Sequence, residues 1–233
     1  MANLSQDFYL IHNLDLLFDV CTKLKPLDDK KYKIPAFLYL IVHNEFYISM
    51  SSFMRRHQSK SFLSLRLAID SALTAYYLLK NPDQESVYLS GVKALVSGER
   101  NKEWNRIFLN IKKTIKNDLD KFPLAKKLTE AHEHCSLYAH SDPCGILHKY
   151  HIDEVNLILQ AKYFDYEKLP GADRQRLAYI LYKFLRVFLI FWHEMFQARA
   201  DEKMGEINNQ LELFKKNLGV FAKKYRHMET EID

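Results

Sequence analysis

Arg66 and Asp70 are the first residues whose types and spacing could support chemistry. They are four residues apart in a run that is otherwise apolar, so a helix would place both on one face. Burying two charges in a helix that is apolar almost all round is costly unless the charges are paired. Two interpretations remain open: a structural ion pair that fixes helix packing, or a guanidinium held by Asp70 and directed into a polar cavity.

A second candidate lies in the segment EAHEHCSLYAHSDPCG, where histidine is locally enriched. Ser136 and His140 are four residues apart on one helical face, His132 is a further turn back, and Tyr138 lies off that face. His140 comes where the helix should end, beside the densest turn signal in the chain. A histidine there suits acid–base catalysis because its pKa lies near neutrality. The alternative is a histidine that caps the helix or packs in the core.

Histidine enrichment also raises the question of a metal site. His132, His134, His140, His148 and His151 fit no recognised metal-binding spacing, and the first two point nearly opposite ways on a helix. We therefore expect neither a metal nor another cofactor.

A third group of polar residues interrupts the apolar run LAYILYKFLRVFLIFWHEMF. Lys183, Arg186, His193, Glu194 and Gln197 form one polar stripe at helical spacing. This stripe predicts the central helix of a soluble bundle rather than a membrane span, since central charges disfavour insertion. We assign Arg186, His193 and Glu194, with Tyr138, to a second tier of the polar site, reached from this long helix.

The run SLRLAIDSALTAYYLLKNPD, followed later by CSLYAHSDP, resembles bacterial all-helical proteins described as HEPN-like. The matching positions are Arg66 with Asp70, where the family has glutamate, and Ser136, Tyr138 and His140 before a small-residue turn. The resemblance implies an all-helical fold and, for an enzyme, metal-independent cleavage of RNA. Arg66 would then stabilise phosphate charge, and His140 would act as general acid or base.

A non-catalytic role is the competing hypothesis. In it the chain is a helical interaction or homodimerisation module, and the same polar residues are structural ion pairs. The net charge of +5 is too small for a dedicated DNA-coating protein, and the basic runs alternate with acids as on a solvated helix face. Motifs of P-loop, Rossmann and α/β-hydrolase proteins do not occur in the sequence.

Composition predicts the fold class. With 6 glycines and 6 prolines in 233 residues, the chain has too few turn formers for an all-β domain and is expected to be mostly helical. The 3 cysteines are odd in number and lack a CxxC spacing, so we expect no structural disulfide. With no signal peptide visible at the N-terminus, a cytoplasmic location is expected.

The positions of prolines and glycines, together with stripes of apolar residues at helical spacing, predict the helices that position the candidate site residues. We expect Ser59 or Ser61 to cap the helix that carries Arg66, and Asn81 and Asp173 to cap later ones. Residues 146–164 are either a short β-hairpin or a helix from Asp153. The expected fold is a single-domain all-α multi-helix bundle over residues 1–233, with core 4–225 and a frayed tail 227–233. One helix is expected before Pro26, with an apolar stripe over residues 10–24, and the others over residues 35–57, 59–80, 82–98, 104–122, 123–140, 173–197 and 207–225.

Overall fold

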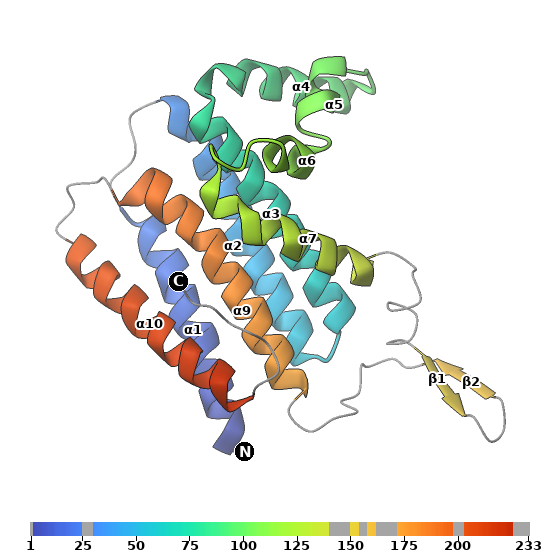
Figure 1. Ribbon diagram of the computed structural model, residues 1–233, viewed down its shortest axis with the longest axis vertical. Helices are drawn as coiled ribbons and strands as arrows, with labels where there is room; N and C mark the ends of the chain where they lie inside the picture. The colour runs from blue at the N-terminus through green and yellow to red at the C-terminus, as the bar shows by residue number, and fades with distance from the viewer. Residues whose placement is uncertain are drawn as a thin grey trace.

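A computed structural model describes residues 2–24, 30–139, 150–153, 158–161, 172–197 and 203–225, with side chains for 5–24, 30–136, 173–197 and 203–225. Long helices lie side by side, and shorter ones gather at one end of the bundle (Figure 1). The expected all-α multi-helix bundle is confirmed. The helices are α1 (Ala2–Thr22), α2 (Lys33–Met54), α3 (Gln58–Lys80), α4 (Glu85–Ser97), α5 (Lys102–Ile107), α6 (Ile111–Lys116), α7 (Lys126–Ala139), α9 (Ala172–Phe191) and α10 (Met204–Lys224).

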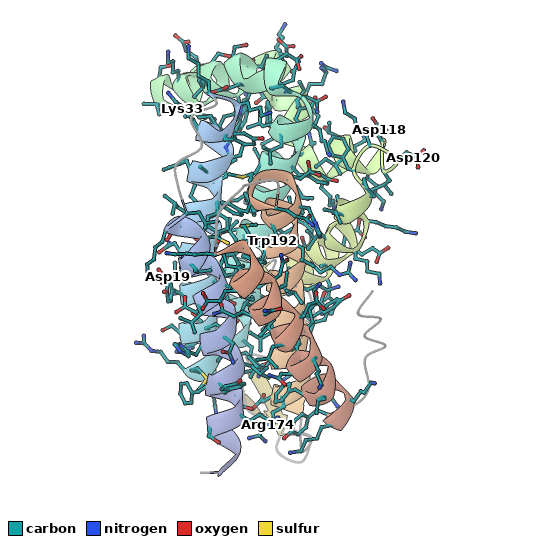
Figure 2. All side chains as sticks on the ribbon, turned by 90° about the vertical axis from the view of Figure 1, so that its left-hand side faces the viewer. Asp19, Lys33, Asp118, Asp120, Arg174 and Trp192 are labelled. Carbon is teal, nitrogen blue, oxygen red and sulfur yellow. The ribbon has the colours of Figure 1, made fainter. Side chains whose placement is uncertain are left out.

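A single hydrophobic cluster joins α1, α2, α3, α5, α6, α7, α9 and α10. α9 contributes many of its members, and its last turn continues as a π-helical segment, Trp192–Phe196. Trp192, seen in the middle of Figure 2, is only 1% exposed. The apolar stripe that runs along α1 and into the turn after it is buried as a whole: its members are Leu10, Leu14, Leu17, Phe18, Cys21 and Leu24.

Helix α3 begins before either of the caps that we expected, at Gln58. Its N-cap is His57, so Ser59 and Ser61 lie inside the first turn and the expected serine cap is wrong. Ser61 instead faces α2, where its hydroxyl lies 2.8 Å from the hydroxyl of Ser49, and both residues are buried. Small residues at this level let α2 and α3 approach closely, and their hydroxyl groups satisfy one another there.

The helix expected over residues 104–122 is broken in two. α5 ends at Ile107 and α6 begins at Ile111. The hydroxyl of Thr114 donates to the Ile107 carbonyl oxygen at 3.0 Å, which gives that carbonyl a partner after its helix ends. The apolar stripe continues through the break because Ile107 and Ile111 both pack into the core. The helical spacing of the apolar residues alone therefore did not reveal the break.

Two further boundaries follow the local chemistry of the chain. Gly98 ends α4 with φ +76°, a left-handed conformation that glycine adopts without strain. Asp173 is not the cap of α9 but lies in its first turn, where its Oδ1 accepts from Gln58 Nε2 at 2.6 Å. This bond ties the start of α9 to the start of α3.

Residues 146–164 contain the hairpin rather than the helix. β1 (Tyr150–Asp153) and β2 (Ile158–Ala161) pair antiparallel, with His151 opposite Gln160.

One helix of the described chain, α3, is long and apolar enough to cross a membrane, and 56% of its apolar window is buried inside the bundle. Core helices of soluble proteins meet the same test, so the observation is weak evidence for a span.

Candidate functional site

Arg66 and Asp70 meet a histidine from another helix. They are one turn apart on α3, and His132 of α7 contacts both of them. Arg66 Nε lies 3.4 Å from His132 Nε2, and the same ring nitrogen lies 2.9 Å from Asp70 Oδ1. The His132 side chain is 10% exposed, whereas that of Asp70 is 38% exposed. The three residues therefore form a half-buried polar cluster where α3 packs against α7.

The shorter contact decides which ring nitrogen of His132 carries a proton. A carboxylate can only accept, so Nε2–H donates to Asp70, and the Arg66 N–H then faces a protonated nitrogen at the longer distance. Nδ1 of His132 is buried without a hydrogen-bond partner in the described chain.

The cluster opens into a pocket of about 520 Å³. Arg66, Asp70 and His132 line one wall of it, and Lys112 and Lys113 line another. Lys112 lies 3.5 Å from Glu133, an acid that also pairs with Lys116, and these lysines lower the pKa of Glu133. The pocket thus holds three cationic side chains and one acidic one along its wall.

Aromatic rings form a third part of the pocket wall. Tyr88 packs edge to face against Phe108, with centroids 5.1 Å apart, and Trp104 lies 6.4 Å from the same ring. Burial raises the pKa of the Tyr88 hydroxyl. Tyr88 and Trp104 are half-buried, whereas Phe108 is buried behind them in the core. Cationic groups beside accessible aromatic rings are the combination that binds phosphates and stacks bases in single-stranded nucleic acids.

The comparisons with known proteins were made against family models, curated proteins and solved structures. None of the three matches this chain. The HEPN-like resemblance therefore stays a prediction.

The expected partners of Arg66 on α7 are only partly within the described chain. Ser136 donates through Oγ to the His132 carbonyl oxygen at 2.7 Å, so its hydroxyl is engaged with its own helix. α7 ends at Ala139, the residue before His140. The side chain of Tyr138 and the whole of His140 lie outside the described residues, so their convergence with Arg66 stays a prediction.

The second tier of expected residues has other partners. Arg186 donates through Nε to the Tyr182 hydroxyl at 2.8 Å and lines a different pocket, between α9 and α10. His193 Nδ1 lies 2.7 Å from Gln197 Oε1, and Glu194 pairs with Lys80 at 2.8 Å. Each of the three side chains therefore has its own local contact.

His132 and the two lysines are the residues that sequence reasoning underused. His132 was placed only one turn behind the serine, and Lys112–Lys113 resembled a solvated face. A usable signal was the pair Trp104 and Phe108, which lie four residues apart, and so on one helical face, shortly before the lysines. It could not be connected to Arg66 without knowing how α5 and α6 pack against α3.

Histidine, cysteine, aspartate and glutamate side chains are the usual ligands of a metal ion. In the part of the chain that the structure describes, no three of them are grouped so as to hold an ion. Cys21 and Cys135 are buried, and burial raises the pKa of the Cys135 thiol to about 12. The remaining cysteine, Cys144, and the side chains of His148 and His151 lie outside the described residues.

We expect His134, on the other side of α7, to make stability depend on pH. Burial first, and then Lys183, lower its pKa from 6.5, and its ring packs against Tyr179 with centroids 5.1 Å apart. The unfolded chain then binds a proton near pH 6.5 that the folded chain does not yet bind. The free energy of unfolding should fall as the pH drops below 6.5, and His134→Gln should reduce this fall.

Urea unfolding at pH 7.5 and 5.5 measures the effect. His193→Gln removes an exposed histidine from the same protein and should leave the pH dependence as in the wild type. An equal pH dependence in His134→Gln and the wild type would contradict the assignment.

Proposed function

We propose that the Arg66 pocket binds a phosphodiester of single-stranded RNA and cleaves it without a metal ion. The observation that carries the proposal is the Arg66–His132–Asp70 cluster in the wall of a pocket that also contains Lys112 and Lys113. A guanidinium recognises phosphate through paired N–H donors, and lysines add point charges beside it.

Each side of the pocket has a distinct part in binding. Arg66 receives the phosphate, and the His132–Asp70 contact keeps negative charge close to the guanidinium while the site is empty. Tyr88 and Trp104, which are half-buried in the pocket lining, offer ring surface for an adjacent base. Stacking of this kind tolerates different bases, so we expect weak sequence preference.

Cleavage without a metal uses the ribose 2′-hydroxyl as nucleophile. Its oxygen attacks the neighbouring phosphorus while a base takes its proton. The bond from phosphorus to the 5′ oxygen then breaks, and an acid protonates that oxygen. The products are a 2′,3′-cyclic phosphate and a 5′-hydroxyl end. Arg66 would stabilise the charge that develops on the phosphate oxygens, and we assign proton transfer to His140 on the strength of the HEPN-like resemblance.

The test measures binding and cleavage of single-stranded RNA separately, with EDTA present. Arg66→Ala is expected to weaken RNA binding by about tenfold or more, since a hydrogen bond to a charged group contributes about 1.5–3 kcal/mol. His132→Gln should weaken binding less, and His140→Ala should abolish cleavage while RNA still binds. Arg55→Ala removes an exposed arginine at the end of α2 and serves as the control. Equal RNA binding by the wild type and Arg66→Ala would refute the proposal.

A specific observation also favours the second candidate, a non-catalytic association module. α2 and α3 expose five large apolar side chains, and the contact of Ser49 with Ser61 places Tyr47 and Leu63 at about the same level of this helix pair. Exposed apolar faces of this kind mark interaction sites. This candidate is preferred if the wild type binds no RNA but sediments as a dimer that Leu67→Asp dissociates. The five residues are Phe37, Leu40, Tyr47, Leu63 and Leu67.

A further inference from the structure

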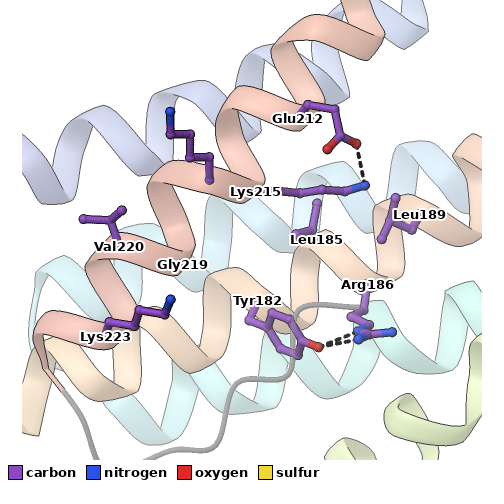
Figure 3. A pocket seen from close by; sticks show the side chains of 10 residues that line it. Tyr182, Leu185, Arg186, Leu189, Glu212, Lys215, Gly219, Val220 and Lys223 are labelled. Carbon is purple, nitrogen blue, oxygen red and sulfur yellow. Dashed lines mark hydrogen bonds and ion pairs between the residues drawn. The ribbon is translucent and has the colours of Figure 1, made fainter.

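A second pocket, of about 650 Å³, lies between α9 and α10 and is independent of the Arg66 site. Figure 3 shows the two helices presenting facing rows of side chains to it. On α9 the row includes Tyr182 and Arg186, which are one turn apart, and on α10 it includes Lys216 and Lys223. The α10 residues lie beside, rather than on, the stripe that packs into the core.

The lining of this pocket is strongly cationic. Arg186, Lys215, Lys216 and Lys223 face one acid, Glu212, which pairs with Lys215 at 2.8 Å. In the described chain neither Lys216 nor Lys223 has an ion-pair partner within 4.0 Å. The pocket therefore carries an excess of positive charge that no acid in its lining balances.

The position of Arg186 is fixed before any ligand arrives. Its Nε and a terminal guanidinium nitrogen both donate to the Tyr182 hydroxyl, and its Cζ lies 5.0 Å from the centre of the Tyr182 ring. The same guanidinium contributes to the lowered pKa of Lys183, after the larger effect of burial, so positive charge is crowded on this side of α9. A fixed cation loses less side-chain entropy when it binds an anion.

The spacing of the cations indicates the size of the anion. Lys216 and Lys223 are seven residues apart on one helix, which corresponds to about 10 Å along its axis. A chain of linked phosphates matches this separation without either lysine having to bend toward the other. Leu185, Leu189 and Val220 add apolar surface to the same pocket and offer a place for an organic group.

We propose that the α9–α10 pocket binds a small polyphosphate, with the phosphates held by Arg186, Lys216 and Lys223. The ligand is either inorganic or the phosphate chain of a nucleotide. Both ligands would be recognised through their phosphates. The apolar side chains of Leu185, Leu189 and Val220 favour the nucleotide, because they can contact its organic part.

Isothermal titration with inorganic triphosphate and with ATP, both without divalent cations, tests the proposal. The double variant Lys216→Ala/Lys223→Ala should bind either probe at least tenfold more weakly than the wild type. Lys93→Ala/Lys102→Ala removes the same charge from exposed positions on α4 and α5 and should bind like the wild type. Stronger binding of ATP than of triphosphate identifies the nucleotide as the source, and equal binding identifies the phosphate chain alone.

Further controls separate the site from general charge attraction, from misfolding and from the Arg66 pocket. The conservative variant Lys216→Arg/Lys223→Arg should retain binding, and Arg66→Ala should leave it unchanged. Three results would overturn the proposal: no binding of either probe, equal weakening in the control double variant, or equal displacement by sulfate at matched ionic strength.

Discussion

Replacement of Phe188 by alanine is expected to lower the free energy of unfolding by about 3–5 kcal/mol. The ring is fully buried in the last turn of α9, where it packs edge to face against Phe18 of α1 at 5.3 Å and stacks near Trp192 at 6.1 Å. Its removal loses apolar transfer energy and leaves a cavity that rigid helices on both sides cannot close.

The next residue along α9 provides the matched control. Leu189 is only partly buried and lines the α9–α10 pocket, so Leu189→Ala should destabilise the protein by much less than Phe188→Ala. Urea unfolding followed by circular dichroism measures both. Phe188→Leu, which should cost less than the alanine variant, keeps the comparison possible if Phe188→Ala does not fold. Equal destabilisation at positions 188 and 189 would contradict this description of the core.

Gly91→Ala is expected to destabilise the protein by roughly 1–3 kcal/mol, although alanine is the better helix former. A Cβ at position 91 would lie 1.9 Å from Cδ1 and 2.0 Å from Cγ of Trp104, so α4 or the indole must move. Because Trp104 also lines the Arg66 pocket, the displacement should alter that pocket as well. Glycine is needed here for close approach, since position 91 lies within a helix.

A double-mutant cycle tests this explanation through a change of sign. In a Trp104→Ala background the clash is absent, so Gly91→Ala should stabilise the protein by up to about 1 kcal/mol. Gly205 is the control, since a Cβ there meets nothing within 4 Å and Gly205→Ala should not destabilise the wild type. Equal destabilisation by Gly91→Ala with and without Trp104 would show that the contact is not the cause.

Helical periodicity predicted the long elements well because it reports a local property of the chain. In α10 the expected stripe lies on one face and most of its members are buried, including Ile207, Phe214 and Phe221. The break between α5 and α6 was missed because the stripe continues across it. The prediction of a serine cap for α3 failed for a different reason. Ser61 forms its hydrogen bond with Ser49 of α2, and the sequence near Ser61 does not reveal a partner on another helix.

The expectation that α3, apolar almost all round, is a buried helix holds for most of its surface but not for all of it. Leu63 and Leu67 are exposed on its outer face although the sequence pattern does not distinguish them from buried leucines. Burial of a given face depends on which helices lie against it, and an apolar residue on the surface is ordinary in folded proteins.

The candidate site shows the same division. The sequence by itself determined that Arg66 and Asp70 share one helical face, because a four-residue spacing fixes this in any α-helix. Only the tertiary structure decided that His132 lies between them, that Lys112 belongs to the same pocket and that Arg186 lines another one. The spacing of residues along the chain determines which of them share a helical face, whereas contacts between helices depend on how side chains of different helices pack in three dimensions.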